Sequence, residues 1–114
     1  MDMALPAKAN ARKRDTPERI SVITSRDNQW LRRFRACLGG DEGRNVIVGV
    51  EGVRLVEAAL GSGLPVEALL VSAQGERHLA RLAGLIAPEL RILRTTDRLF
   101  AGVADTQTPQ GVAA

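Results

Sequence analysis

Few residues of this chain carry side chains suited to catalysis or metal binding. The sequence holds one histidine, His78, and one cysteine, Cys37. His78 falls on the polar side of a predicted helix, between Arg77 and Leu79, where an exposed ring is expected rather than a general base. Cys37 has no partner histidine to activate it as a nucleophile, and one cysteine with one histidine is too few for a structural zinc site. The sequence therefore indicates no catalytic residue and no metal ligand.

A carboxylate and an arginine follow a β-branched run and open a predicted helix. Residues 45–50 (NVIVGV) are typical of a buried strand, and Glu51 and Arg54 come just after them. Ligand sites of open parallel sheets lie at the carboxyl ends of strands, so the two side chains could contact a ligand together. The ordinary alternative is a carboxylate stabilised at a helix start and a solvated acid–arginine pair. The G-x-x-G spacing of Gly49 and Gly52 fits neither a dinucleotide fingerprint nor a P-loop.

Positive charge is concentrated toward the N-terminus. The chain has 16 Lys and Arg against 13 Asp and Glu, a net charge of +3. Residues 1–35 hold nine of the cations and four of the acids, and 14 of the 16 cations are arginines. Arginine suits phosphate because its planar fork donates hydrogen bonds in pairs. The pattern favours a nucleic-acid partner, although an arginine-rich composition can also reflect the genome of the source.

Composition narrows the remaining classes of protein. A chain of 114 residues with 45% hydrophobic content fits one domain with a buried core. Aromatic residues make up only 3%, so the core must be aliphatic and a stack of base-binding aromatics is not expected. The longest apolar runs fall far short of the roughly 18–20 residues needed to cross a bilayer, and no apolar signal core opens the chain. We expect a cytoplasmic protein with no membrane partner.

Residues 1–18 differ from the rest of the chain. They contain two prolines and a basic cluster but almost no spaced apolar residues, so they cannot offset the entropy cost of ordering. We expect a disordered basic arm that either contacts RNA or keeps this end soluble. A basic organellar presequence is a further alternative, against which the acidic residues of the segment count.

From residue 19 onward, strand and helix patterns alternate in one domain. Strands are predicted at residues 20–24, 45–50, 66–72 and 90–94, with a last one starting at 112. Helices are predicted from the capping residues 25–28 to about 38, and over 53–60, 76–86 and 97–104. This alternation predicts a mainly parallel sheet covered on both faces by helices, an α/β fold.

Helical periodicity separates apolar from charged faces. In the first predicted helix one sector holds the apolar side chains Trp30, Leu31, Phe34, Cys37 and Leu38, and the other holds the arginines Arg32, Arg33 and Arg35. Trp30 is expected to pack against the core rather than stack on a base, and Cys37 is expected to be buried. In the helix over residues 76–86, the apolar stripe consists of Leu79, Leu82, Ala83 and Ile86.

Three motifs carry a family resemblance over residues 20–112. They are the S-R-x-N entry at residues 25–28, the run VEGVRLVEAAL at residues 50–60 and the exit TQTPQG at residues 106–111. Together they resemble the N-terminal substrate-binding domain of SpoU-type RNA ribose 2′-O-methyltransferases, the TrmH branch of the SPOUT superfamily. The resemblance implies a three-layer α/β/α sandwich similar to the ribosomal and snoRNP proteins that bind kink-turn RNA.

The resemblance also implies a division of labour in the parent protein. The domain would present RNA, and a following knotted domain would bind S-adenosylmethionine, transfer its methyl group to a ribose hydroxyl and dimerise. This chain has no counterpart of the cofactor knot or of the catalytic arginine, so the resemblance implies no cofactor here. In kink-turn proteins an Asn-Glu pair and a basic residue read the RNA; Glu51 and Arg54 match, whereas Val50 replaces the asparagine and counts against kink-turn binding.

The sequence thus predicts an RNA-recognition domain of an RNA 2′-O-methyltransferase acting on ribosomal RNA, with the catalytic domain outside this fragment. The predicted RNA contacts, mostly to phosphate, are Arg26, Asn28, Arg32, Arg33, Arg35, Arg44, Glu51 and Arg54. Two alternatives stay open: a module that packs on its own catalytic domain or another protein, and a stand-alone kink-turn protein. We expect the fragment to be a monomer and the parent a homodimer.

Overall fold

The computed structural model describes residues 20–39, 47–104 and 106–114. One sheet has the strand order β1-β3-β2-β4. The strands are β1 (Ile20–Val22), β2 (Ala68–Val71), β3 (Arg91–Arg94) and β4 (Val112–Ala113). The helices are α2 (Gln29–Leu38), α3 (Val53–Leu60), α4 (Leu79–Leu82) and α5 (Asp97–Val103), with 3₁₀ segments η1 (Gln74–His78) and η2 (Ala83–Leu85) on either side of α4.

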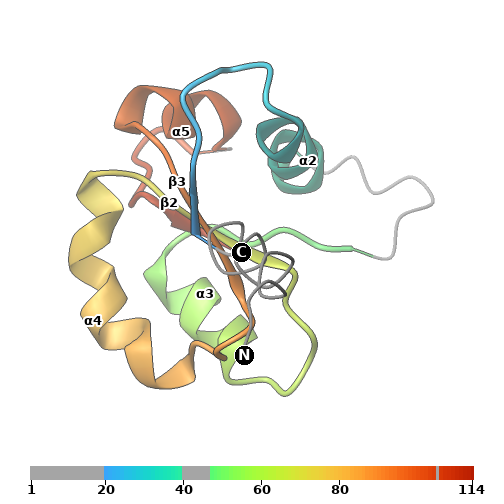
Figure 1. Ribbon diagram of the computed structural model, residues 1–114, viewed down its shortest axis with the longest axis vertical. Coiled ribbons are helices and arrows are strands. Elements are labelled where there is room, and N and C mark those ends of the chain that lie inside the picture. The colour runs from blue at the N-terminus through green and yellow to red at the C-terminus, as the bar shows by residue number, and fades with distance from the viewer. Residues whose placement is uncertain (1–19, 40–46, 105) are drawn as a thin grey trace, which may run out of the picture.

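Helices cover both faces of the sheet (Figure 1). Along β2, Ala68 and Leu70 join a core with α2 and α5, whereas Leu69 and Val71 join a second core with α3 and α4. All four side chains are buried, as expected for a strand covered on both faces. β3 pairs in parallel with both β1 and β2. The predicted three-layer α/β/α fold with a mainly parallel sheet is therefore confirmed.

The last strand runs the other way. β4 is antiparallel to β2, with Leu70 opposite Ala113. The chain enters β4 through Gly111, whose φ is +85°, a conformation that glycine adopts at little cost. Gly75 of η1 packs so closely on this turn that a Cβ there would overlap the Gly111 carbonyl oxygen. The two glycines thus hold the segment before β4 against the carboxyl end of β2.

Capping explains the limits of α2. The Asn28 side-chain oxygen accepts a hydrogen bond from the Trp30 N–H at 2.7 Å, which satisfies a donor of the first turn. At the other end the Gly39 N–H donates to the Arg35 carbonyl at 3.0 Å. The predicted start and end of this helix are confirmed.

The apolar sector of α2 faces the sheet as predicted. Leu31 and Phe34 are buried, and Trp30 and Leu38 are partly buried against the same core. Cys37 is only half-buried, so the expectation of a buried residue is met only in part. It lies beside the segment that leads to α3, where the Cβ of a residue replacing Gly49 would be 2.9 Å from the Cys37 Cβ.

The expected buried strand over residues 45–50 is wrong where the structure describes it. From residue 47 onward the segment is not a strand, and Val48 is 77% exposed. Only its end is paired: Val50 and Ala114 exchange two backbone hydrogen bonds of 2.9 Å, and Glu51 forms an isolated bridge to β4. The pairing that the structure describes thus begins only at the end of the run.

The helix expected over residues 76–86 is divided. Only α4 is α-helical, between η1 and η2. Leu79, Leu82 and Ile86 pack in the second core as predicted. Ala83 is exposed instead, because the chain tightens to a 3₁₀ turn there and the apolar stripe no longer follows the α-helical period. Within the described ranges, no helix is both long and apolar enough to span a membrane.

Candidate nucleic-acid interface

A shallow depression of about 320 Å³ lies at the start of α3. One wall is the first turn of α3 with the residues before it, and the other is the segment that leads to β4. The lining residues are Glu51, Gly52, Val53, Arg54, Leu55, Thr106, Thr108 and Gln110. The VEGVR and TQTPQG motifs, distant in the sequence, therefore form one site, because Glu51 bridges to β4.

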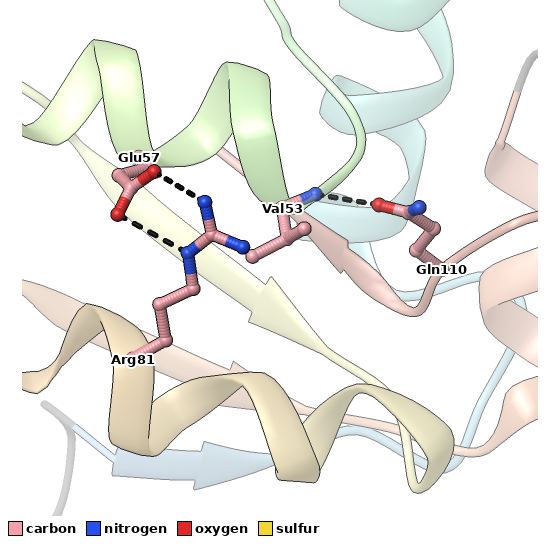
Figure 2. A network of polar contacts seen from close by, with 4 residues as sticks. All are labelled: Val53, Glu57, Arg81 and Gln110. Atoms are coloured by element: carbon pink, nitrogen blue, oxygen red, sulfur yellow. Dashed lines mark hydrogen bonds and ion pairs between the residues drawn. The ribbon is translucent and has the colours of Figure 1, made fainter.

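Gln110 joins the two walls of the depression. Its side-chain oxygen accepts a hydrogen bond from the Val53 N–H at 2.7 Å (Figure 2). Its backbone N–H donates to Oε2 of Glu51 at 3.2 Å. Gly52, the N-cap of α3, has a φ of +103° and no side chain with which to cap the helix. Gln110 therefore supplies, from another segment, an acceptor for one of the first-turn N–H donors that the helix itself leaves unpaired.

The depression combines groups that attract phosphate with one carboxylate. Arg54 is exposed at the N-terminal end of α3, where the helix dipole is positive. The Arg54 and Leu55 amides lie in the first turn, so they have no carbonyl one turn earlier in the helix. Glu51 is half-buried beside them. The site can therefore receive an anion and also accept a hydrogen bond from a neutral donor.

An ion pair farther along α3 leaves Arg54 available. Glu57 and Arg81 of α4 form a two-pronged contact, with Nε–Oε2 at 3.2 Å and Nη2–Oε1 at 2.8 Å (Figure 2). The hydrogen bond from Arg81 lowers the pKa of Glu57, and the positive charges of Arg81 and Arg54 lower it further. Desolvation acts in the opposite direction but is a smaller effect than the hydrogen bond. Among the described residues, Arg54 makes no ion pair.

The predicted arginines of α2 lie in the opposite helical layer from the depression. Arg32 and Arg35 are exposed, and Arg35 Nε reaches a backbone carbonyl of α5 at 3.5 Å. Arg33 is more constrained, because its Nη2 lies 2.6 Å from Oε1 of Glu67. Its guanidinium also covers the Trp30 ring, 4.5 Å from the centroid. The indole is thus occupied by the protein's own arginine, in line with the expectation that it packs rather than stacks on a base.

The remaining predicted contacts fall in three places. Arg26 is exposed in the turn before α2. Asn28 uses its side-chain oxygen to cap that helix. Arg44, like the predicted arm over residues 1–18, lies outside the described residues. The structure therefore brings Glu51 and Arg54 into one site and keeps the residues of α2 in a separate layer.

His78 is not the exposed residue that its polar helical position suggested. It is half-buried, and its Nε2 atom is buried with no hydrogen-bond partner among the described residues. Desolvation lowers the pKa of His78, and the charges of Arg77 and Arg81 lower it further. The described part of the chain gathers no set of three or more His, Cys, Asp or Glu side chains that could hold a metal ion.

The sequence reasoning missed Gln110, Thr106 and Thr108 as lining residues. Their motif marked the exit from the domain and was given no role in binding. One signal indicated that an acceptor from elsewhere is needed: a glycine before the helix that begins at residue 53 leaves first-turn donors without a local side-chain cap. Composition and periodicity do not say which segment supplies it.

Comparison with known proteins identifies the domain. Residues 44–114 match the family model of the MRM3-like substrate-binding domain. The chain belongs to this family. The matched range includes both walls of the depression, and the prediction of a substrate-binding domain is confirmed.

Solved structures of similar fold accompany the MRM3-like family match. An rRNA methyltransferase from Sinorhizobium meliloti gives a TM-score of 0.61 at 21% identity over 83% of this chain. The AdoMet-bound rRNA methyltransferase from the same organism gives 0.59 at 22% identity, also over 83%. This chain spans only 36% and 35% of those proteins, and the likeness concerns the fold. The search of curated proteins gives no match.

Proposed function

We propose that this chain is the RNA-recognition domain of an rRNA methyltransferase and that it binds RNA at the depression. Its membership of a substrate-binding domain family supports this proposal, as do the neighbours of similar fold that are rRNA methyltransferases. The exposed arginines of α2 add a second set of phosphate contacts from the other layer.

The observation that carries the proposal is the junction of Glu51, Arg54 and Gln110. Arg54 and the free amides of the first turn of α3 attract a phosphate, which positions an RNA without reading its sequence. Glu51 accepts from the Gln110 backbone N–H within the chain, and its charge repels phosphate, so we assign to it an RNA contact in which it accepts a hydrogen bond from a base edge or a ribose hydroxyl. The depression therefore has the two kinds of group that RNA recognition requires.

We assign the methyl-transfer chemistry of the parent protein to a domain other than this one. None of the described residues that line the depression is aromatic, so this lining does not fit an adenine-containing cofactor. We assign S-adenosylmethionine, and methyl transfer to a ribose 2′-hydroxyl, to a separate catalytic domain of a dimeric cytoplasmic parent. In this chain the residues bind and orient RNA only.

The proposal is tested by the salt dependence of RNA binding. Fluorescence anisotropy with a labelled, structured ribosomal RNA fragment gives the affinity of the full chain at several salt concentrations. Arg54→Ala should weaken binding to all sequences and reduce the slope of log affinity against log salt by roughly 0.7, the value of one single-strand phosphate contact. Arg77→Ala removes the same charge outside the depression and should leave the slope unchanged.

A different result would favour the alternative function. If the wild-type chain shows no salt-dependent RNA binding, the proposal is wrong and a module that packs on another protein domain replaces it. If Arg54→Ala and wild type give the same slope while RNA is bound, the depression is not the RNA site.

A further inference from the structure

The Gln110 side chain is held in one orientation. An amide group has an oxygen that accepts and a nitrogen that donates, and a hydrogen bond to either one fixes which way the group faces. Here the oxygen accepts from the Val53 N–H at 2.7 Å. The amide nitrogen is consequently on the other side, away from α3 (Figure 2).

The Gln110 nitrogen is an unused donor in the depression. Within the described residues, the side-chain amide nitrogen of Gln110 has no hydrogen-bond partner, and the residue is exposed. Glu51 lies against the same residue, because its Oε2 accepts from the Gln110 backbone N–H at 3.2 Å. Its other oxygen, Oε1, makes no hydrogen bond with a described residue. A fixed N–H donor and a carboxylate acceptor are thus neighbours in the lining of one site.

We propose that Gln110 and Glu51 together form a specificity-determining pair that reads the edge of an unpaired nucleobase. The inference rests on the proposed function and adds to it the class of group that is read. A carboxylate needs N–H donors, and the adjoining amide needs an acceptor. Guanine matches this order best, because its Watson–Crick edge carries two adjacent N–H donors beside a carbonyl oxygen. Single-stranded loops expose such edges to proteins.

Gln110→Glu separates the reading role from the capping role. Glutamate has the same length, and its carboxylate can still accept from the Val53 N–H at the positive end of α3, so the fold is retained. The donors are lost. Leu55→Glu is the matched control, since it adds the same charge to the lining of the depression and leaves the Gln110 amide intact. Glu51→Gln removes the acceptor while keeping an oxygen for the Gln110 backbone N–H.

The experiment uses four hairpin RNAs that differ only in one unpaired loop nucleotide. Fluorescence anisotropy gives the affinity of the full chain for each RNA, and thermal unfolding confirms that each variant folds. Wild type should prefer the guanine hairpin by about tenfold, the scale of one well-aligned pair of base contacts. Gln110→Glu and Glu51→Gln should each abolish that preference, whereas Leu55→Glu should weaken all four RNAs alike and keep it.

Each outcome bears on a specific claim. If wild type binds all four hairpins equally, or if Gln110→Glu keeps the guanine preference, the specificity role of Gln110 is wrong although RNA recognition stands. If Leu55→Glu abolishes the preference as well, added charge explains the result and the role of the amide is again wrong. If wild type binds none of them, the proposed function fails together with the inference.

Discussion

Single side chains of this domain show how burial changes what a residue can do. His78 has the ordinary histidine pKa of 6.5 as its reference, and in the fold that pKa is lowered. The ring is desolvated first of all, and the charges of Arg77 and Arg81 act in the same direction. Since the buried Nε2 has no described hydrogen-bond partner, no contact in the described structure compensates for placing a proton there.

The lowered pKa of His78 predicts a loss of stability on mild acidification. The unfolded chain takes up a proton as the pH falls through about 6.5, whereas the folded chain does so only at lower pH. The free energy of unfolding should therefore decrease below about pH 6.5 and stop decreasing, for this residue, below the folded pKa. Urea unfolding at pH 7.5 and 5.5 measures the difference. His78→Gln should reduce the drop between the two pH values; an equal drop in both proteins would contradict the prediction.

At the scale of elements, α2 carries arginines of two kinds. Arg33 is engaged with Glu67 and Trp30, in a surface ion pair whose side chains are 45% and 52% exposed. Pairs of this kind contribute little to stability, but they reduce the charge that is available to a ligand. Arg32 and Arg35 form no ion pair among the described residues. They are the stronger candidates for phosphate contacts.

This difference between the arginines of α2 predicts unequal effects on RNA binding. Replacing Arg32 and Arg35 together by Ala should weaken binding to all RNAs and lower the salt slope by roughly 1.4, twice the value of one single-strand contact. Arg33→Ala should change the slope much less, because Glu67 already neutralises that charge. Salt titrations of the two variants give the comparison, with circular dichroism as the check on folding. Equal slopes for the double variant and wild type would show that Arg32 and Arg35 do not contact RNA and that this face of α2 is only solvated surface.

The helices and strands also show which parts of the fold could be predicted from the sequence. α3 was predicted with its observed bounds, because its apolar period is regular and Gly61 follows it. The run over residues 45–50 was misassigned because β-branched residues indicate extended backbone without showing whether another strand pairs with it. The helix over residues 76–86 was predicted as continuous, because its apolar positions follow the α-helical period and do not show where the chain tightens to 3₁₀ turns.

Only part of the candidate site was predicted, because local sequence patterns do not contain tertiary contacts. Glu51 and Arg54 share one helix start, so local spacing was enough to place them together. Gln110 reaches the same point across a sequence separation of 57 residues from Val53, and only the antiparallel pairing of β4 with β2 brings it there. Local patterns therefore locate one wall of the depression, and the topology of the sheet supplies the other.

At the scale of the whole molecule, the chain is expected to bind RNA but not the cofactor of the parent protein. This chain spans 36% and 35% of the S. meliloti rRNA methyltransferases, one of which is described as AdoMet-bound. The depression of about 320 Å³ is lined by two threonines, one glycine, Gln110, the charged Glu51 and Arg54, and the aliphatic Val53 and Leu55. Pockets that bind small molecules the size of a nucleoside cofactor are usually deeper and lined mostly by apolar or aromatic side chains. The described lining of this depression offers adenine no aromatic side chain on which to stack.

We therefore expect the isolated chain to bind RNA but not S-adenosylmethionine. Isothermal titration calorimetry of the folded chain with the cofactor should show no binding with a micromolar dissociation constant. The same preparation should bind the ribosomal RNA fragment, which serves as the control for an active protein. Saturable binding of one cofactor per chain would contradict the assignment, and it would move part of the catalytic site into the domain described here. Because Gln110 and Arg54 lie in the depression, loss of that heat in Arg54→Ala would then locate the cofactor on the surface that we assign to RNA.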